Sequence, residues 1–387
     1  MAALVLKGAR SLERGVPGEQ HEVWVARGVV VAAGTRVDDV REVPLDGRLV
    51  LPALVNAYDV LDQSTLPALG AHPPYRSLYE WTSACAVEMA DHAAALAVPL
   101  VDRLFLGGMR NLLAGAAAVL HHHADHRSLA RPDFPVRVQR RYGFAHSPGL
   151  TPELRRTYRS SDRRIPWVVR AAEGSDPRLR GELALLAGAN VLRQNTVIAH
   201  GTALEPDDAA VLAGARASLA WCPESDLRLY GRTAPAACML SSGVSVGLGS
   251  DGAAAGARDL LSNLASARGR GGLDDSALLD LATHGSAAVA RLPVGGFEAG
   301  SPADLLIVDS LEALLAGDRR AVLLLLVRGE SVYGLPELVE AAGRPALQLS
   351  VDGERRALDA RLGRRLSTLL RRYPAARQGA WLAEVAV

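Results

Sequence analysis

The chain has 387 residues, of which 49% are hydrophobic and 22% are charged, and its formal net charge is +1. This length exceeds one small domain and allows a large core. The near-neutral charge argues against binding to nucleic acid or to a membrane surface, so the expected partner is a small molecule. No apolar run has membrane-spanning length, and no secretory signal pattern is found, so we expect a cytoplasmic protein. The three cysteines are scattered and form no disulfide or metal motif.

Short strands are predicted near both ends of the chain, where apolar runs alternate with turn residues. Neither group of strands is large enough to be stable alone, so we expect the two groups to form one β unit together. The predicted strands are 3–7, 22–26 and 29–33 near the start, and 305–308, 321–327 and 331–333 near the end.

Between Leu51 and Leu292, apolar runs alternate with amphipathic segments, which is typical of βα units and a parallel sheet. The Arg-rich tail after Ala357 has leucines at helical spacing, so it is predicted to be a helix packed on the surface. The predicted strands are 51–57, 116–121, 136–140, 165–170, 197–200, 217–221 and 244–248, and the predicted helices are 101–113, 175–187, 206–213, 234–242 and 274–290.

The stretch from Leu219 to Ala255 carries the strongest functional pattern. It contains two short buried-type strands separated by a polar loop and a helical segment. The second strand ends in Gly249-Ser250-Asp251-Gly252, so a carboxylate follows its C-terminal end. In a closed parallel barrel, that end carries the chemistry.

Two blocks, CPESDLRLYG…APAACMLSSGVSVGLGSDGAA and FEAGSPADLLIVD, resemble the amidohydrolase superfamily, in the branch of triazine hydrolases, guanine deaminase and adenosine-homologue deaminases. The resemblance implies an α/β fold: a (β/α)8-type TIM barrel with a small β-sandwich built from both chain ends. We expect the barrel at 51–296, the sandwich at 1–50 and 297–345, and a helical extension at 346–387. Proteins of this fold commonly dimerise, so a homodimer is compatible with the resemblance.

The resemblance implies a metal centre, but most of its ligands are replaced in this sequence. In LPALVNAYDVLD, Tyr58 and Val60 stand where the family has a His-x-His pair. In WVVRAAEG, Arg170 replaces another ligand His, three residues before Glu173. Valine has no donor atom, tyrosine is a poor zinc ligand, and a guanidinium cannot lose its proton. We therefore expect no metal cofactor; zinc could bind only through relocated ligands.

Three family residues with catalytic roles persist: Glu173, His200 in VIAHGTAL, and Asp251. The resemblance assigns Glu173 to catalysis, His200 to steering the attacking nucleophile and Asp251 to accepting a proton. For Arg170 two interpretations stand equally: it neutralises carboxylates left without a metal, or it holds an anionic group of a ligand.

Further ligand-binding candidates follow other strands, in addition to Tyr58 and Arg170. His121, His122 and His123 end one strand; because strand residues alternate, either His122 or the other two point inward. They form a hydrogen-bonded cluster or, less often for such clusters, a relocated metal site with His200 and Asp251. His146 in GFAHSPGLTPEL resembles a substrate-contacting histidine. Trp81 in the segment Leu78-Tyr79-Glu80-Trp81 is a packing anchor or a stacking surface for substrate.

Three functions remain open from the sequence. The first is a divergent, metal-independent enzyme that acts on C–N bonds or transfers protons on a small polar substrate. The second is a non-catalytic homologue that binds a small ligand or a partner in the inherited pocket. The third is a conventional metal-dependent hydrolase or deaminase with relocated ligands.

Overall fold

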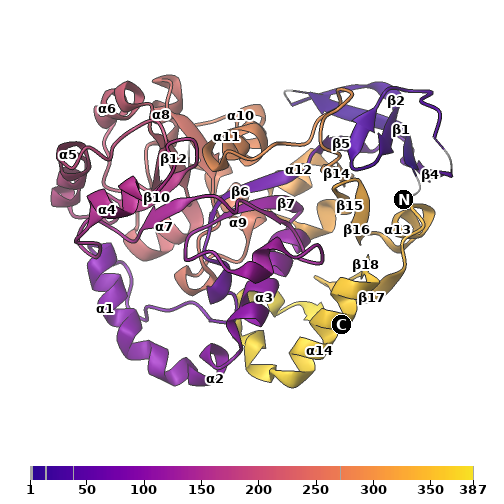
Figure 1. The fold of residues 1–387 in the computed structure, drawn as a ribbon. Coiled ribbons are helices and arrows are strands. Elements are labelled where there is room, and N and C mark those ends of the chain that lie inside the picture. The colour runs from indigo at the N-terminus through magenta and orange to yellow at the C-terminus, as the bar shows by residue number, and fades with distance from the viewer. Residues whose placement is uncertain (1–2, 14, 38, 271, 387) are drawn as a thin grey trace.

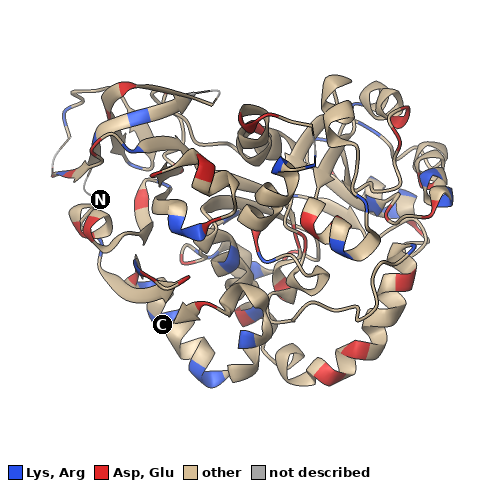
Figure 2. Cartoon of the chain, turned by 180° about the vertical axis from the view of Figure 1, so that it is seen from behind, with Lys and Arg blue, Asp and Glu red and all other residues tan. Residues whose placement is uncertain are grey.

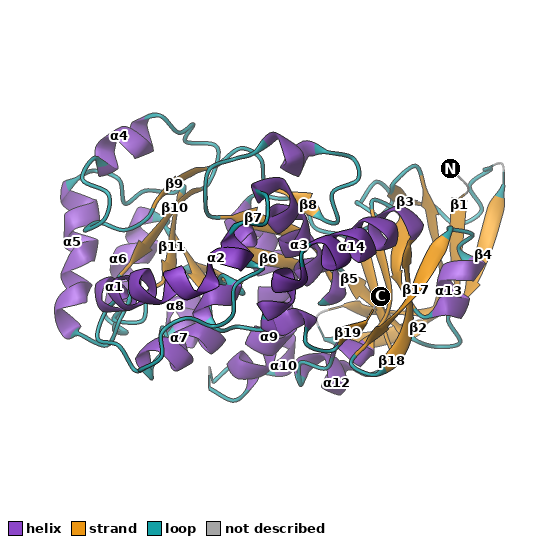
Figure 3. Ribbon diagram, turned by 90° about the horizontal axis from the view of Figure 1, so that it is seen from below, coloured by secondary structure: helices purple, strands orange, loops and turns teal. Residues whose placement is uncertain are grey.

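The computed structural model describes residues 3–13, 15–37, 39–270 and 272–386. Strands from both chain ends join in one mixed sheet of eleven strands, in the order β19-β17-β18-β16-β15-β14-β5-β1-β2-β3, with β4 beside β1. Figure 1 shows this sheet on one side of the molecule, and Figure 3 shows it in another view. Its strands are β1 (Ala3–Glu13), β2 (Val16–Ala26), β3 (Val29–Val31), β4 (Val40–Pro44), β5 (Leu49–Pro52), β14 (Leu305–Val308), β15 (Val322–Val327), β16 (Glu330–Gly334), β17 (Ala346–Val351), β18 (Glu354–Asp359) and β19 (Val385–Ala386).

The middle of the chain forms two parallel sheets of three and five strands, in the orders β6-β7-β8 and β13-β12-β11-β10-β9. The backbone N–H groups of Ser250 and Asp251 both donate to the carbonyl of Tyr58, so the chain leaving β13 lies against β6. The strands are β6 (Leu54–Asp59), β7 (Ala116–His121), β8 (Arg137–Val138), β9 (Gly143–Ala145), β10 (Trp167–Ala171), β11 (Thr196–His200), β12 (Ser218–Trp221) and β13 (Ser245–Leu248).

Helices surround the parallel strands, and the five helical segments predicted between Leu51 and Leu292 each begin or end near an observed helix boundary. Within the described ranges, no single helix is long and apolar enough to cross a membrane, although the pair Leu78–Leu96 and Leu100–Leu113, bent by 97°, meets the length and composition test together. The helices are α1 (Leu78–Glu88), α2 (Ala93–Leu96), α3 (Leu100–Leu113), α4 (Leu154–Arg159), α5 (Gly181–Gly188), α6 (Asp208–Ala215), α7 (Pro223–Tyr230), α8 (Ala236–Ser241), α9 (Leu260–Arg268), α10 (Asp275–Asp280), α11 (Ser286–Ala290), α12 (Leu311–Leu315), α13 (Pro336–Ala341) and α14 (Ala360–Arg372).

The tail is the clearest departure from the predicted elements. The expected helical extension at 346–387 contains one α-helix of the expected kind, α14, but β17, β18 and β19 extend the large sheet. α14 then crosses to α3, where the guanidinium of Arg365 lies 4.0 Å from the centre of the Phe105 ring. Farther along, the Trp381 indole donates to the carbonyl of Ser64. The tail therefore joins the large sheet to the part of the chain that carries the parallel strands.

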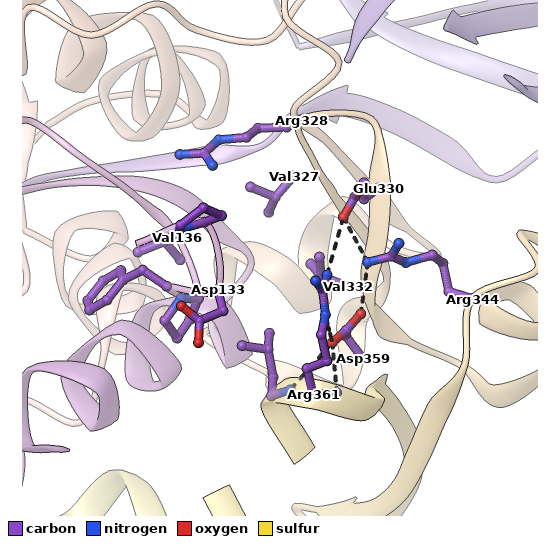
Figure 4. A pocket seen from close by; sticks show the side chains of 13 residues that line it. Asp133, Val136, Val327, Arg328, Glu330, Val332, Arg344, Asp359 and Arg361 are labelled. Carbon is purple, nitrogen blue, oxygen red and sulfur yellow. Dashed lines mark hydrogen bonds and ion pairs between the residues drawn. The ribbon is translucent and has the colours of Figure 1, made fainter. Parts of the chain in front are cut away.

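A cavity of about 240 Å³ lies where the 132–136 segment meets the large sheet and the start of α14. Figure 4 shows Glu330 and Asp359 between the side chains of Arg344 and Arg361. Arg344 Nη2 donates to both carboxylates, at 2.7 and 2.9 Å. Charges of both signs are interspersed over the whole molecule (Figure 2). In the cavity, the two carboxylates of Glu330 and Asp359 are matched by the two guanidinium groups of Arg344 and Arg361. We therefore interpret this ion-pair network as a structural contact between the two parts of the chain.

A buried polar network fixes the start of the candidate site. Arg110 of α3 and Asp59 at the end of β6 form an ion pair at 3.2 Å, and both side chains are about 1% exposed. Arg110 also donates to the backbone carbonyls of Ser250 and Asp251. Burying an ion pair is favourable only when its remaining hydrogen bonds are satisfied, and here backbone carbonyls satisfy them. The network holds the ends of β6 and β13 at fixed positions.

Candidate active site

The carboxyl ends of four parallel strands bring the predicted catalytic residues together. Tyr58 lies on β6, Arg170 on β10 and His200 on β11, while Glu173 and Asp251 follow β10 and β13. Because parallel strands end at a common edge, residues far apart in the sequence meet there. His200 Nε2 lies 3.6 Å from Asp251 Oδ2 and 4.0 Å from Glu173 Oε2.

Arg170 is paired with Glu173 by two hydrogen bonds, 2.7 Å from Nε to Oε2 and 2.5 Å from Nη2 to Oε1. Tyr230 also donates to Glu173 Oε1, at 2.6 Å. Burial alone raises the pKa of Glu173, but the charges of Arg170 and His200 outweigh burial and bring the pKa below its ordinary value. Glu173 is therefore an anion held by Arg170, as in the first of the two interpretations of Arg170.

His200 is oriented by an acid that the sequence analysis did not single out. Its Nδ1 lies 2.8 Å from Asp226 Oδ1, and Thr233 donates to the other oxygen of Asp226. Burial lowers the pKa of His200, but Glu173, Asp251 and Asp226 together raise it above its ordinary value. Burial raises the pKa of Asp226 to about 6 in spite of the hydrogen bond from His200. The pair resembles the base-and-orienter arrangement of acid–base catalysts.

Asp226 and Tyr230 both lie on α7 and both reach the site. They are four residues apart, so they share one face of the helix. α7 directly follows β12, at the same edge as the other strand ends. This spacing after a predicted strand is the signal that could have identified both residues from the sequence.

Several buried polar atoms near Tyr58 have no hydrogen-bond partner among the described residues. They are His200 Nε2, Asp251 Oδ2, the Tyr58 hydroxyl and both ring nitrogens of His122. The Tyr58 ring lies between the two histidines, with ring centres 5.0 Å from His122 and 5.3 Å from His200. Unpartnered buried polar atoms are uncommon and mark places where function opposes stability.

The backbone at these strand ends is also strained. His200 has φ of +70° and Asp251 has φ of +55°, in the left-handed region that disfavours side chains with a Cβ. Ala172, between Arg170 and Glu173, has φ of +51°. Residues in such conformations cluster at ligand-binding and catalytic sites.

A cavity of about 250 Å³ opens above this cluster, and Arg170 forms part of its lining. Trp81 and His146 also line it, as does His123. The cavity is lined by Gln63, Leu66, Leu69, Leu78, Trp81, Thr82, Cys85, Ala86, Met89, His123, His146, Leu150, Arg170 and Ala254. The predicted residues Tyr58, His122, Glu173, His200 and Asp251 are at most 1% exposed and are not part of this lining.

The three consecutive histidines have different environments, as strand alternation requires. His122 is buried beside Tyr58, and burial lowers its pKa well below the ordinary value. His121 is also buried, with a pKa lowered to about 4 by burial. His123 lines the cavity, and its Nδ1 lies 2.8 Å from Asp62 Oδ1. Sequence reasoning selected His122, whereas the cavity is lined by His123.

The donor groups do not fit a zinc site. Among the described residues, no group of three or more His, Cys, Asp or Glu side chains could hold a metal ion. The guanidinium of Arg170 is hydrogen-bonded to the Glu173 carboxylate. Burial raises the pKa of Tyr58 well above its ordinary value, so the Tyr58 phenol stays protonated. A protonated phenol and a guanidinium are not metal ligands. The cavity thiol is also unreactive, because burial raises the pKa of Cys85 to about 11.

Residues 167–341 match the amidohydrolase family. A 5-methylthioadenosine/S-adenosylhomocysteine deaminase of Haloquadratum walsbyi is 38% identical over 136 residues, which is 33% of this chain and 31% of that protein. A protein of the same name from Nitratidesulfovibrio vulgaris is 33% identical over 132 residues, 32% of this chain and 30% of that protein. The matched stretch thus spans about a third of the curated relatives.

Solved structures cover much more of the chain. An adenosine deaminase from Xanthomonas campestris with bound zinc aligns with a TM-score of 0.71 at 20% identity, over 85% of this chain and 92% of that one. An atrazine chlorohydrolase from Arthrobacter aurescens complexed with zinc aligns with a TM-score of 0.65 at 17% identity, over 85% and 95%. These alignments show the fold, and the family match covers the strands that carry Arg170, His200 and Asp251. Residues 167–341 are therefore similar to the amidohydrolase family, and the chain as a whole is similar in fold to these two solved structures.

Proposed function

We propose that this chain is a metal-independent amidohydrolase homologue that binds a small organic molecule in the cavity over Arg170. The observation that carries the proposal is the ion pair between Arg170 and Glu173, which holds a guanidinium at a fixed position in the cavity wall. A guanidinium keeps its charge at every physiological pH, so it replaces part of the electrostatic role of a cation. The proposal includes the fold: the eight parallel strands form a (β/α)8 barrel, and the large sheet forms the β-sandwich beside it.

Ligand binding is favoured because the cavity has the composition of a small-molecule site. Its walls are mainly apolar, and a few polar groups converge on one side. Glu173, His200 and Asp251 are not part of the lining, and their side chains are at most 2% exposed. A catalytic group must reach the reacting atoms. A ligand in the cavity therefore contacts Arg170, Trp81 and His146 before it contacts the buried acid–base groups.

A second candidate function, proton transfer without a metal, is favoured by one specific observation. His200 Nε2 and Asp251 Oδ2 lie 3.6 Å apart, and neither has a hydrogen-bond partner among the described residues. Asp226 orients the imidazole from its other side. Once a substrate reaches Nε2, His200 can give or accept a proton, and Arg170 stabilises negative charge. Without a metal to activate water, isomerisation or elimination is easier for this centre than hydrolysis of a C–N bond.

Metal content is the first test of the proposal. Protein purified without chelators, and without added metal, is analysed by elemental mass spectrometry. We expect less than about a tenth of an equivalent of zinc, iron or manganese, far below the occupancy of a tight site. A near-stoichiometric metal that disappears in both His200→Ala and Asp251→Ala would overturn metal independence and favour a relocated-ligand hydrolase.

The two candidate functions are separated by one variant. His200→Gln keeps a side chain that can hydrogen-bond Asp226 but cannot accept a proton as imidazole does. If the chain is a binding protein, ligands selected by a thermal-shift screen bind the variant as they bind the parent. If it is a proton-transfer enzyme, solvent deuterium enters a bound substrate in the parent and not in His200→Gln.

A further inference from the structure

We infer that the ligand of this cavity is an amphipathic organic carboxylate: its anionic group bonds to Arg170 and His123, and its apolar body lies against Trp81. The inference rests on the proposed binding function and specifies its ligand class. Three observations support this ligand class. The pair with Glu173 leaves one guanidinium nitrogen of Arg170 free, and the lining of this cavity has no acidic side chain. The rest of the cavity wall is apolar.

The first step concerns the free edge of Arg170. Glu173 occupies Nε and Nη2, while Nη1 makes no hydrogen bond to another described residue. Arg170 lines the cavity, so we assign to the ligand the N–H groups that Glu173 does not use, which are those of Nη1 and the second one of Nη2. A guanidinium already fixed by one carboxylate loses little side-chain freedom when it binds another. Hydrogen bonds between charged groups are about twice as strong as neutral ones.

His123 supplies a second donor on the same cavity. The Asp62 carboxylate accepts a hydrogen bond from Nδ1–H, and Nε2 has no partner in the described part of the chain, so Nε2 donates to a ligand only in the doubly protonated ring. The carboxylate of Asp62 is committed to this histidine, and the hydrogen bond brings the pKa of Asp62 below its ordinary value in spite of burial. The His123 ring centre lies 5.7 Å from that of His146, which also lines the cavity. Arg170 is therefore the permanent charged donor in the lining, and His123 is a second donor in its doubly protonated form.

Charge decides against a cationic ligand. None of the fourteen lining residues is Asp or Glu, so a bound ammonium group would meet no carboxylate in the cavity wall. The carboxylates of Glu173 and Asp251 are outside the lining, with side chains 1–2% exposed. An ammonium group would thus be desolvated beside a guanidinium, which costs free energy without compensation.

The rest of the wall defines the ligand body. Nine lining residues are apolar, from Leu66 in the loop before α1 to Ala254 after β13. Trp81 brings the apolar and charged regions together, because the Arg170 guanidinium carbon lies 5.2 Å from the centre of its ring. A flat apolar group on Trp81 therefore places an attached carboxylate near Arg170. Aromatic faces beside arginine favour planar ligands.

The test compares three probes that share a phenylethyl body and differ in their terminal group, which is an anion, a neutral amide or a cation: 3-phenylpropionate, 3-phenylpropanamide and 3-phenylpropylamine. Binding is measured by isothermal titration calorimetry near neutral pH. We expect the carboxylate to bind about tenfold or more tighter than the amide, the range of one charge-assisted hydrogen bond, and the amine to bind weakest. A carboxylate that binds no tighter than the amide or the amine overturns the ligand class.

Variants of the lining residues then test whether the carboxylate of the probe binds at Arg170 and His123. Because Arg170→Met leaves the Glu173 carboxylate without its guanidinium partner, we use the double variant Arg170→Met with Glu173→Gln, which removes both buried charges. We expect it to abolish the preference for the carboxylate, and His123→Gln to reduce that preference. Arg178→Met, whose parent side chain is 83% exposed and pairs with Asp176, is the matched control and keeps the preference. Full preference in the double variant would overturn the inference.

Failure of this inference is distinguishable from failure of the proposed function. If the amide or the amine binds best and Trp81→Ala weakens that binding, the cavity is a binding site of another class. If none of the three probes binds, and a fragment library of anions, cations and neutral compounds gives no hit that Trp81→Ala weakens, both the ligand class and the binding function are wrong.

Discussion

At the scale of single residues, Arg170 is the centre of the site. It forms two hydrogen bonds with Glu173, lies beside Trp81 and lines the cavity. The family likeness identified the position, and the chemistry of a guanidinium excluded a metal-ligand role. The structure adds that Arg170 is already paired, with Glu173 and not with Asp251.

Removing one partner of this pair is expected to be costly. Arg170→Met leaves the buried Glu173 carboxylate without its guanidinium partner, so we expect the free energy of unfolding to fall by about 3–5 kcal/mol. The double variant with Glu173→Gln should recover much of that loss, because both charges are gone. Urea denaturation followed by circular dichroism measures both, with Arg178→Met as the exposed control. A single variant as stable as the parent would contradict the buried pair.

The buried pair of His200 and Asp226 predicts how stability depends on pH. The pKa of His200 is raised above 6.5, so its contribution is fully present below 6.5 and is lost as pH rises through the folded value. The pKa of Asp226 is raised from 3.8 to about 6, so the stability that protonated Asp226 contributes is also lost as pH rises from 3.8 through about 6. We therefore expect the stability contributed by this pair to fall as pH rises from about 5.

Asp226→Asn tests that sign. It removes the titration of Asp226 and an acceptor that raises the pKa of His200, so the dependence of stability on pH should become flatter. Urea denaturation across a pH series measures the slope in parent and variant. Equal slopes, or stability in the parent that rises more steeply with pH than in the variant, would contradict the assignment.

At the scale of elements, the tight approach of β6, β12 and β13 determines where the site residues lie. A Cβ on Gly249, just after β13, would lie 2.8 Å from Cys222 Sγ and 2.8 Å from Tyr58 Cβ. Real Cβ contacts are not that short, so only glycine allows the three strands to approach this closely. The position of Tyr58 beside His200 depends on this packing.

Two glycine substitutions with opposite expected signs test the packing. Gly249→Ala should lower the free energy of unfolding by about 1–3 kcal/mol through overpacking. Gly214→Ala, inside α6 where an added Cβ meets nothing within 4 Å, should raise it by about 0.5–1 kcal/mol through helix propensity. Thermal unfolding of both variants gives the comparison. A Gly249→Ala variant that is as stable as Gly214→Ala would show that the strands can separate without cost.

At the scale of the whole molecule, the tail closes the structure by joining both of its parts. β17 and β18 extend the large sheet, α14 packs against α3, and Trp381 is 1% exposed with its indole bonded to Ser64. The arrangement is visible in Figure 1, where the yellow α14 lies near α3. The tail is therefore part of the folded core.

Trp381→Ala measures that contribution. Truncating a buried tryptophan leaves a cavity and an unpaired carbonyl, so we expect a loss of about 3–5 kcal/mol in the free energy of unfolding. Val87→Ala, whose parent side chain is 78% exposed, is the control and should change stability by less than about 0.5 kcal/mol. A small effect of Trp381→Ala would show that the tail is only loosely packed on the rest of the molecule.

Local patterns in the sequence were sufficient for much of the fold. Runs such as 116–121 and 305–308 are strands at the predicted residues, because a fully buried strand is apolar on both faces. The helix predicted at 101–113 is α3, beginning one residue earlier. Strands β17 and β18 were missed because part of each is exposed, so an apolar run does not mark them, and the leucine spacing of the following helix dominated the tail.

The sequence by itself indicated the likeness to amidohydrolases, the candidate residues and the expectation that these residues bind no zinc, because side-chain chemistry and spacing within one strand end are local properties. Only the tertiary structure decided which of them meet. It paired Arg170 with Glu173, placed Asp226 against His200, buried His122 and exposed His123 to the cavity. These outcomes depend on how separate strands and α7 pack at one edge, and contacts between distant segments leave no mark in any single stretch of sequence.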